Sequence, residues 1–93
     1  MARYEIIGAN GSHVIEARGR DEWALIELAA AGQAGCTAIE NPAPRWSGYV
    51  HNLRAMGVDI ETVTERHSGL FPGNHARYVL HSLVLFAEAK DAA

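Results

Sequence analysis

The segment between Pro44 and Gly57 places its apolar side chains on one side of a helix. They recur at positions i, i+3, i+4 and i+7, which is the spacing of an amphipathic helix. These residues are Trp46, Tyr49, Val50 and Leu53. Proline is tolerated at or just before the first turn of a helix, and glycine commonly follows the last turn. The pattern therefore predicts a helix over residues 45–56 with one buried face, and the rest of the chain must cover that face.

Two further helices are expected before this segment. Asp21 is a preferred N-cap residue and Gly32 is a natural helix stop, while the alanines and leucines between them favour helix. Residues 35–41 leave room for about two helical turns that end before the first of two prolines, since the residue before a proline is pushed away from helical geometry. The buried stripe of the first helix is expected to comprise Trp23, Ile26 and Ala30, with Leu25, Leu28 and Ala29 beside them.

A β-hairpin is expected after the helices. Residues 58–66 alternate in polarity and are rich in β-branched types, residues 68–74 contain two glycines and a proline, and residues 76–83 return as a second strand. We interpret this strand, loop and strand as a wing over residues 58–83.

A second β-hairpin is expected at the start of the chain. Residues 3–7 and 13–17 are short segments of β-forming residues on either side of Asn10-Gly11. This dipeptide favours a tight turn because both residues accept a positive φ. At the other end, residues 84–93 either extend the last strand or form a helical turn.

The order of these elements predicts an α+β fold, a winged helix-turn-helix with three helices and a C-terminal β-hairpin wing, preceded by an N-terminal β-hairpin. Residues 1–93 form a single domain, divided into the hairpin (1–18), a three-helix core (20–57) and the wing (58–83). In such a fold the third helix packs its apolar stripe on the first two and offers its outer face to the major groove of DNA.

Residues 44–80 resemble small bacterial and prophage winged helix-turn-helix proteins. The shared pattern is R-x-S-x-x-[IV]-x-x-L-R-x-x-G-[VW]-x-[IV]-E-T. The matching residues are Arg45, Ser47, Val50, Leu53, Arg54, Gly57, Val58, Ile60, Glu61 and Thr62, followed by residues 73–80 in the wing. The resemblance implies a winged helix fold and a DNA-binding or regulatory role.

The charges of the chain are polarised along its length. The net charge is −3, yet residues 45–57 and 66–87 hold four arginines, three histidines in the second segment, and no acid. Residues 19–44 hold one arginine and four acids. Phosphate contacts require Lys and Arg, so the second half of the chain is the part that suits nucleic acid.

A helical wheel of residues 44–55 predicts which side chains could touch DNA. Pro44, Gly48, His51 and Ala55 lie opposite the apolar stripe, flanked by four polar or basic residues. Arginine can pair with guanine or phosphate, and asparagine with adenine. The expected DNA-binding residues are Arg45, Ser47, Gly48, His51, Asn52 and Arg54 on the third helix, and Arg66, His75 and Arg77 in the wing. The structural alternative is that these arginines are solvated surface residues.

Other function classes have little support in the sequence. There is no nucleophile, phosphate-binding or dinucleotide motif, so no catalytic residue, cofactor or small-molecule substrate is expected. The histidine spacing matches no metal motif, although Glu65, His67 and His75 could converge across the wing. We expect no membrane partner, and the single Cys36 fits a cytoplasmic location.

The sequence therefore predicts a protein that binds double-stranded DNA and is not an enzyme. The expected role is that of a phage-type transcriptional regulator or a recombination accessory factor. Tight binding would require a homodimer on two half-sites. The alternative is a protein-interaction module on the same scaffold, which the acidic net charge favours.

Overall fold

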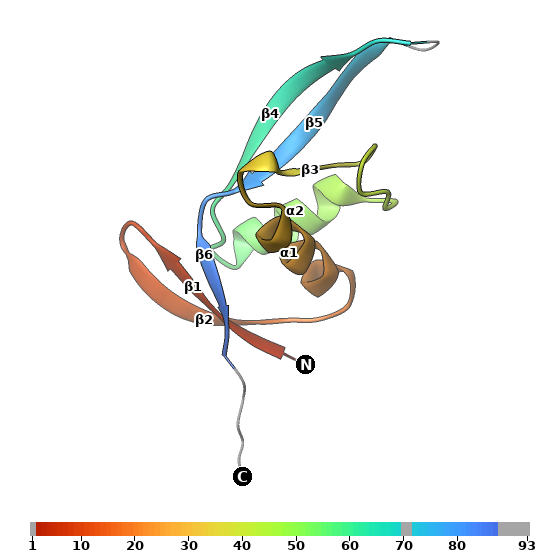
Figure 1. Ribbon diagram of the computed structural model, residues 1–93. Helices are drawn as coiled ribbons and strands as arrows, with labels where there is room; N and C mark the ends of the chain where they lie inside the picture. The colour runs from red at the N-terminus through yellow and green to blue at the C-terminus, as the bar shows by residue number, and fades with distance from the viewer. Residues whose placement is uncertain (1, 70–71, 88–93) are drawn as a thin grey trace.

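The computed structural model describes residues 2–69 and 72–87, which form two α-helices and two small antiparallel sheets (Figure 1). In chain order the elements are β1 (Ala2–Gly8), β2 (Gly11–Ala17), α1 (Gly19–Ala31), the 3₁₀ turn η1 (Gly32–Ala34), β3 (Cys36–Thr37), α2 (Trp46–Ala55), β4 (Ile60–His67), β5 (Gly73–Leu80) and β6 (Leu83–Phe86). Within the described residues, no helix is both long enough and apolar enough to cross a membrane.

The predicted strand, loop and strand of the wing are present as the β4–β5 hairpin, but the prediction of a C-terminal hairpin over residues 58–83 is wrong. The second strand ends at Leu80, and Leu83 begins β6, which belongs to the other sheet. The two strands pair antiparallel from Ile60 opposite Leu80 to His67 opposite Gly73. The hairpin extends away from the two helices, as Figure 1 shows. The short strand β3 pairs with the other side of β5, so the sheet order is β3-β5-β4.

The predicted short helix over residues 35–41 is wrong, and so is the prediction of three helices. Cys36 and Thr37 are fully buried and extended in β3, followed by a turn over residues 38–40. Two sets of interactions favour a strand and a turn over a helix in this segment. Cys36 and Thr37 pair with Tyr78 and Arg77 at the edge of β5, and Thr37 Oγ1 accepts a hydrogen bond from the backbone N–H of Glu40 at 2.9 Å. Gly35, with φ 71°, lets the chain approach β5 closely, because a Cβ there would lie 2.6 Å from the Tyr78 carbonyl oxygen.

The predicted N-terminal hairpin is confirmed, with a different turn. Gly8 and Gly11 pair with each other, so the two loop residues are Ala9 and Asn10. The positive φ falls on Gly11 alone, at 126°, and not on Asn10. The described part of the tail is a strand: β6 pairs with β1, and the second sheet has the order β2-β1-β6. Residues 88–93 lie outside the described part of the chain.

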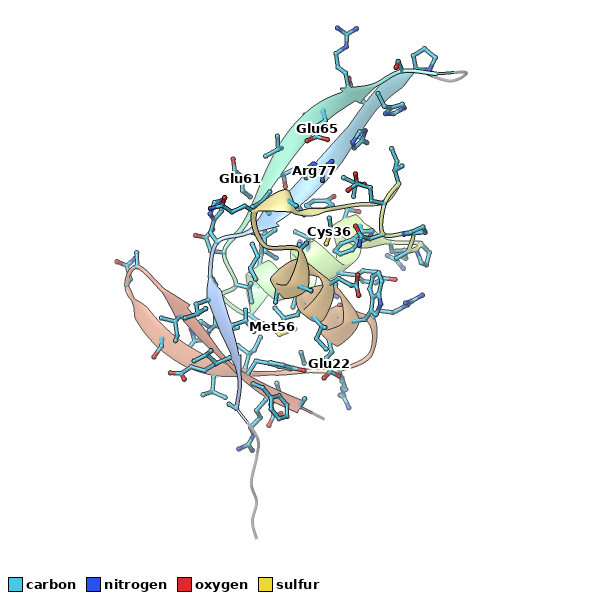
Figure 2. The ribbon with its side chains drawn as sticks, viewed as in Figure 1. Glu22, Cys36, Met56, Glu61, Glu65 and Arg77 are labelled. Carbon is cyan, nitrogen blue, oxygen red and sulfur yellow. The ribbon has the colours of Figure 1, made fainter. Side chains whose placement is uncertain are left out.

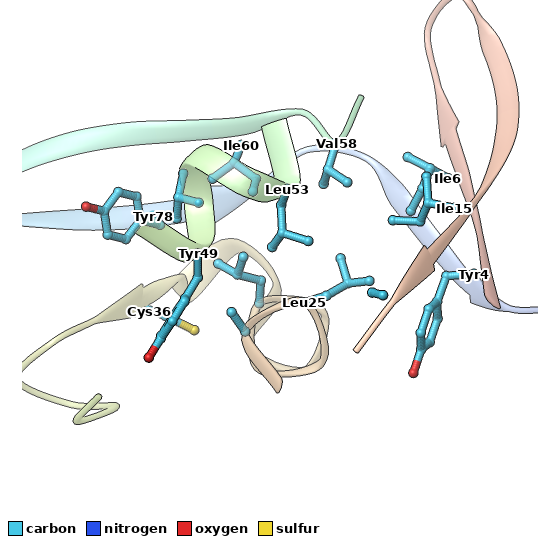
Figure 3. Packing of buried hydrophobic residues seen from close by; sticks show 14 of the residues in the cluster. Tyr4, Ile6, Ile15, Leu25, Cys36, Tyr49, Leu53, Val58, Ile60 and Tyr78 are labelled. Carbon is cyan, nitrogen blue, oxygen red and sulfur yellow. The ribbon is translucent and has the colours of Figure 1, made fainter. Parts of the chain in front are cut away.

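The predicted apolar face of α2 is confirmed. Leu53 is completely buried and packs near Leu25 and Val58 in the centre of the core (Figure 3). Trp46 stacks on Tyr78 with ring centroids 6.0 Å apart, and its indole N–H donates to a backbone carbonyl of the preceding loop at 2.7 Å. This helix thus joins the wing to α1.

The predicted stripe of α1 is partly wrong. Its buried residues are Ala24, Leu25 and Leu28, whereas Ile26 is 48% exposed. At about 100° per residue, Ile26 points roughly 200° away from both Ala24 and Leu28, so one face cannot bury all three. The helix turns its two leucines inward because α2 and the β1–β2 sheet both pack against it, as Figure 3 shows for Leu25, Ile6 and Ile15.

Candidate nucleic-acid interface

The exposed side of α2 carries the predicted contact residues. Arg45 and Ser47 are exposed at its start, and His51 is exposed one turn further on. The Arg45 side chain lies over Gly48, where a Cβ would stand 3.8 Å from its Nε atom. A shallow hollow collects five of the predicted residues with two others. It is lined by Asp21, Arg45, Ser47, Gly48, Tyr49, His51 and Asn52.

Asn52 is held by an acid that the sequence analysis did not assign to the interface. Its side-chain amide donates to both carboxylate oxygens of Asp21, at 3.2 and 3.3 Å. Pairing with adenine needs a donor and an acceptor from the same amide, and here the donor side faces Asp21. Asp21 was interpreted as the N-cap of α1. The helix begins two residues earlier at Gly19, and this places Asp21 in its first turn, beside α2.

Arg54 fastens α2 to the beginning of the wing. Its Nε and Nη2 atoms donate to the Ile60 carbonyl at 3.1 and 2.7 Å, and Nη2 also donates to Thr62 Oγ1 at 2.8 Å. The side chain remains exposed. Its guanidinium group therefore already has partners within the chain.

Arg77 lies at the base of the wing, in contact with Glu65 (Figure 2). Its Nε donates to Glu65 Oε2 at 2.6 Å, and its Nη1 donates to the Ala34 carbonyl at 2.7 Å and to Glu40 Oε1 at 3.1 Å. The hydrogen bond from Arg77 is the main reason that the pKa of Glu65 lies below its usual value. One guanidinium thus joins β4, β5, η1 and the turn after β3.

His75 belongs to the same network. Its Nε2 atom lies 3.1 Å from Glu65 Oε1, and its Nδ1 atom lies 2.9 Å from Nδ1 of His67. A carboxylate only accepts, so His75 Nε2 is the donor in the hydrogen bond to Glu65. In the contact between the two rings, one Nδ1 atom donates and the other accepts. Although these three residues converge, the described residues contain no group of three or more His, Cys, Asp or Glu placed to hold a metal ion.

Arg66 occupies the outer part of the wing. It is exposed and pairs across the hairpin with Asn74. Within residues 2–69 and 72–87, neither Arg66 nor Arg45 has a carboxylate within 4.0 Å. The nine predicted residues therefore divide into five with no side-chain hydrogen bond among the described residues and four whose side chains are already engaged within the chain.

The arrangement of α1, β3, α2 and the β4–β5 hairpin defines a winged helix protein. A family model described as a winged helix domain matches residues 14–90, and the chain belongs to this family. The match confirms the winged helix family inferred from residues 44–80 and extends the matched region into β2 and through β6. Winged helix domains are in general DNA-binding, regulatory modules without catalytic activity. No curated protein and no solved structure matches the chain.

Proposed function

We propose that this protein binds double-stranded DNA through the exposed side of α2 and the outer part of the wing. The observation that carries the proposal is the α2 face itself, where Arg45, Ser47 and His51 stand exposed around Gly48. A helix with small residues on its outer side can approach base edges closely, and its polar side chains can contact bases or phosphates. The family to which the chain belongs supports the same use of this helix.

The nine predicted residues take two different roles in this proposal. Arg45, Ser47, Gly48 and His51 face the major groove, and Arg66 reaches the adjacent phosphate backbone. Asn52, Arg54, His75 and Arg77 are positioning residues, because their side chains are engaged with Asp21, the start of β4, or Glu65. They hold the helix and the wing in their relative orientation.

We further propose that the protein is a cytoplasmic regulator and not an enzyme. In this proposal the protein acts as a phage-type transcriptional regulator or as a recombination accessory factor. The proposed activity is binding alone.

Fluorescence anisotropy with a labelled duplex tests the proposal. Arg45→Gln should weaken binding and reduce the magnitude of the log–log salt slope by about 0.9 for each bound chain, the value expected for one lost phosphate contact per chain. The matched control is Arg3→Gln, which removes the same charge from β1, where Arg3 forms an exposed ion pair with Glu16 at 3.1 Å. Equal effects of the two variants would show that charge alone matters and that α2 is not the contact surface.

A second candidate function is a protein-interaction module without DNA binding. The net charge of −3 and the Asp21 carboxylate in the hollow beside α2 favour it. The same titration separates the two functions, because a protein of this second kind leaves the anisotropy of the duplex unchanged even at low salt.

A further inference from the structure

Strand β6 is an open, apolar sheet edge. Its sequence is Leu83-Val84-Leu85-Phe86, of which Leu83 is 56%, Leu85 45% and Phe86 65% exposed. Among the described residues, no strand pairs with its outer side. Natural proteins usually protect such edges with charges, proline or bulges, because an unprotected edge recruits another strand.

The opposite edge of the same sheet is protected. Strand β2 carries His13 and Glu16, and Glu16 forms an ion pair with Arg3 of β1 at 3.1 Å. His13 donates from Nε2 to the Met56 carbonyl at 2.8 Å and so ties β2 to the end of α2. The two edge strands of this sheet thus differ. Strand β2 has a charged side chain and a side chain bonded to another element, and β6 has neither.

The backbone of β6 identifies the groups that are open to a partner. The N–H of Ala87 donates to the carbonyl of Arg3 at 2.8 Å, so Ala87 faces β1. Backbone groups alternate in direction along a strand, and Leu85 and Leu83 therefore face β1 as well. Val84 and Phe86 consequently direct their N–H and C=O groups toward the open side.

We propose that β6 pairs antiparallel with β6 of a second copy of this chain. If Val84 pairs with the partner's Phe86, and Phe86 with the partner's Val84, all four open groups of each strand are used. This register is centred on Leu85 and generates a closed two-fold dimer. The chain has a net charge of −3, and this uncharged strand lets two copies approach without placing like charges opposite each other.

The same register pairs apolar side chains on both faces of the sheet. Leu85 lies opposite Glu5 in β1, which lies opposite Val14 in β2, so these three residues share the outer face. In the dimer Leu85 meets the partner's Leu85 on that face. On the inner face Phe86, whose ring stands edge-on to Tyr4 with centroids 5.6 Å apart, packs against the partner's Val84. The result is one continuous six-stranded sheet.

The oligomeric state of the full chain in solution, without DNA, tests this proposal. Sedimentation or light scattering should give twice the mass of one chain for the wild type. Leu85→Lys should reduce the mass to that of a monomer while the circular dichroism spectrum stays unchanged. Val14→Lys is the matched control, because Val14 is 57% exposed on the same face at the opposite edge, and this variant should remain dimeric. A monomeric wild type, or a dimeric Leu85→Lys variant, would overturn the proposal.

A cross-link tests the register and does not depend on the folding of the lysine variant. In the proposed pairing the two Leu85 residues form a non-hydrogen-bonded pair, with Cα atoms about 4.5 Å apart, which is within the range of a disulfide. Leu85→Cys should therefore form a disulfide-linked dimer under mild oxidation, and Val14→Cys should not. The native Cys36 does not compete, because it is fully buried and burial raises the pKa of its thiol to about 11. Failure of Leu85→Cys to cross-link would exclude this interface, whatever the outcome of the DNA titrations.

Discussion

Arg45 and Arg77 carry the same charge and differ in what surrounds it. Arg45 is exposed at the start of α2, whereas Arg77 donates to two carboxylates and one carbonyl. A guanidinium with three partners within the chain loses those contacts if it turns toward a phosphate. An exposed one loses only its hydration, so Arg45 is the better DNA contact.

Tyr4 is another residue whose surroundings determine its chemistry. Its hydroxyl donates to Glu22 at 2.7 Å, across the contact between β1 and α1. Burial, followed by the hydrogen bond and charge of Glu22, raises the pKa of Tyr4 to about 12 from a usual value of 10.0. The neutral phenol is therefore favoured in the folded state.

We expect this shift to make the wild type lose stability at alkaline pH. Since the folded pKa lies above the unfolded one, the stabilisation is complete below about pH 10 and is lost as the pH rises toward about 12. Tyr4→Phe removes this dependence. Urea unfolding of both proteins at about pH 8 and about pH 11 measures it. A free energy of unfolding that falls with pH equally in both proteins would contradict the assignment.

At the scale of the element, the sequence predicted correctly those features that depend on residues close together in the chain. The stripe of α2 and the two hairpins follow from periodicity and turn residues, and the structure has all three. The predicted second helix failed because β5, about 40 residues away in sequence, captures Cys36 and Thr37 as a strand. The pairing of β6 with β1 likewise depends on residues about 80 positions apart, which no local pattern reveals.

The interface was predictable to a similar degree. The wheel of residues 44–55 placed Arg45, Ser47, Gly48, His51 and Asn52 around one hollow. It could not show that Asn52 is held by Asp21, or Arg77 by Glu65, because those partners come from other elements. Contacts between elements determine which polar side chains remain without a partner. These contacts cannot be predicted from the residues of one element alone.

The buried face of α2 and the exposed side of α1 give a stability prediction with an internal control. Leu53→Ala should lower the free energy of unfolding by about 2–4 kcal/mol, since Leu53 is fully buried. Ile26→Ala removes a similar side chain from the exposed side of α1 and should cost less than about 1 kcal/mol. Thermal or urea unfolding of both variants checks this, and a larger loss for Ile26→Ala would reverse the orientation described for α1.

At the scale of the whole molecule, the distribution of free charge limits the strength of DNA binding. Arg45 and Arg66 are the arginines of the proposed interface that lack an acidic or carbonyl partner among residues 2–69 and 72–87. A single chain therefore offers few phosphate contacts, and a second copy doubles them.

The salt dependence of DNA binding should reflect the number of phosphate contacts. Two phosphate contacts give a log–log slope of about −1.8 for one chain and about −3.6 for a dimer on two half-sites. Titrations of duplex at several salt concentrations, with the wild type and with Leu85→Lys, measure both values. A wild-type slope steeper than about −6 would show that the engaged arginines, Arg54 and Arg77, contact phosphates as well.

The central position of β1 in its sheet has a consequence for how the chain folds during synthesis. Tyr4 pairs with Phe86, and Ile6 with Val84, so one side of β1 cannot pair until β6, about 80 residues later, is available. Contacts between such distant residues slow folding because the intervening chain must first be closed into a loop. On the ribosome, the β1–β2 hairpin and both helices emerge before β6, so this sheet is completed only after β6 has been synthesised.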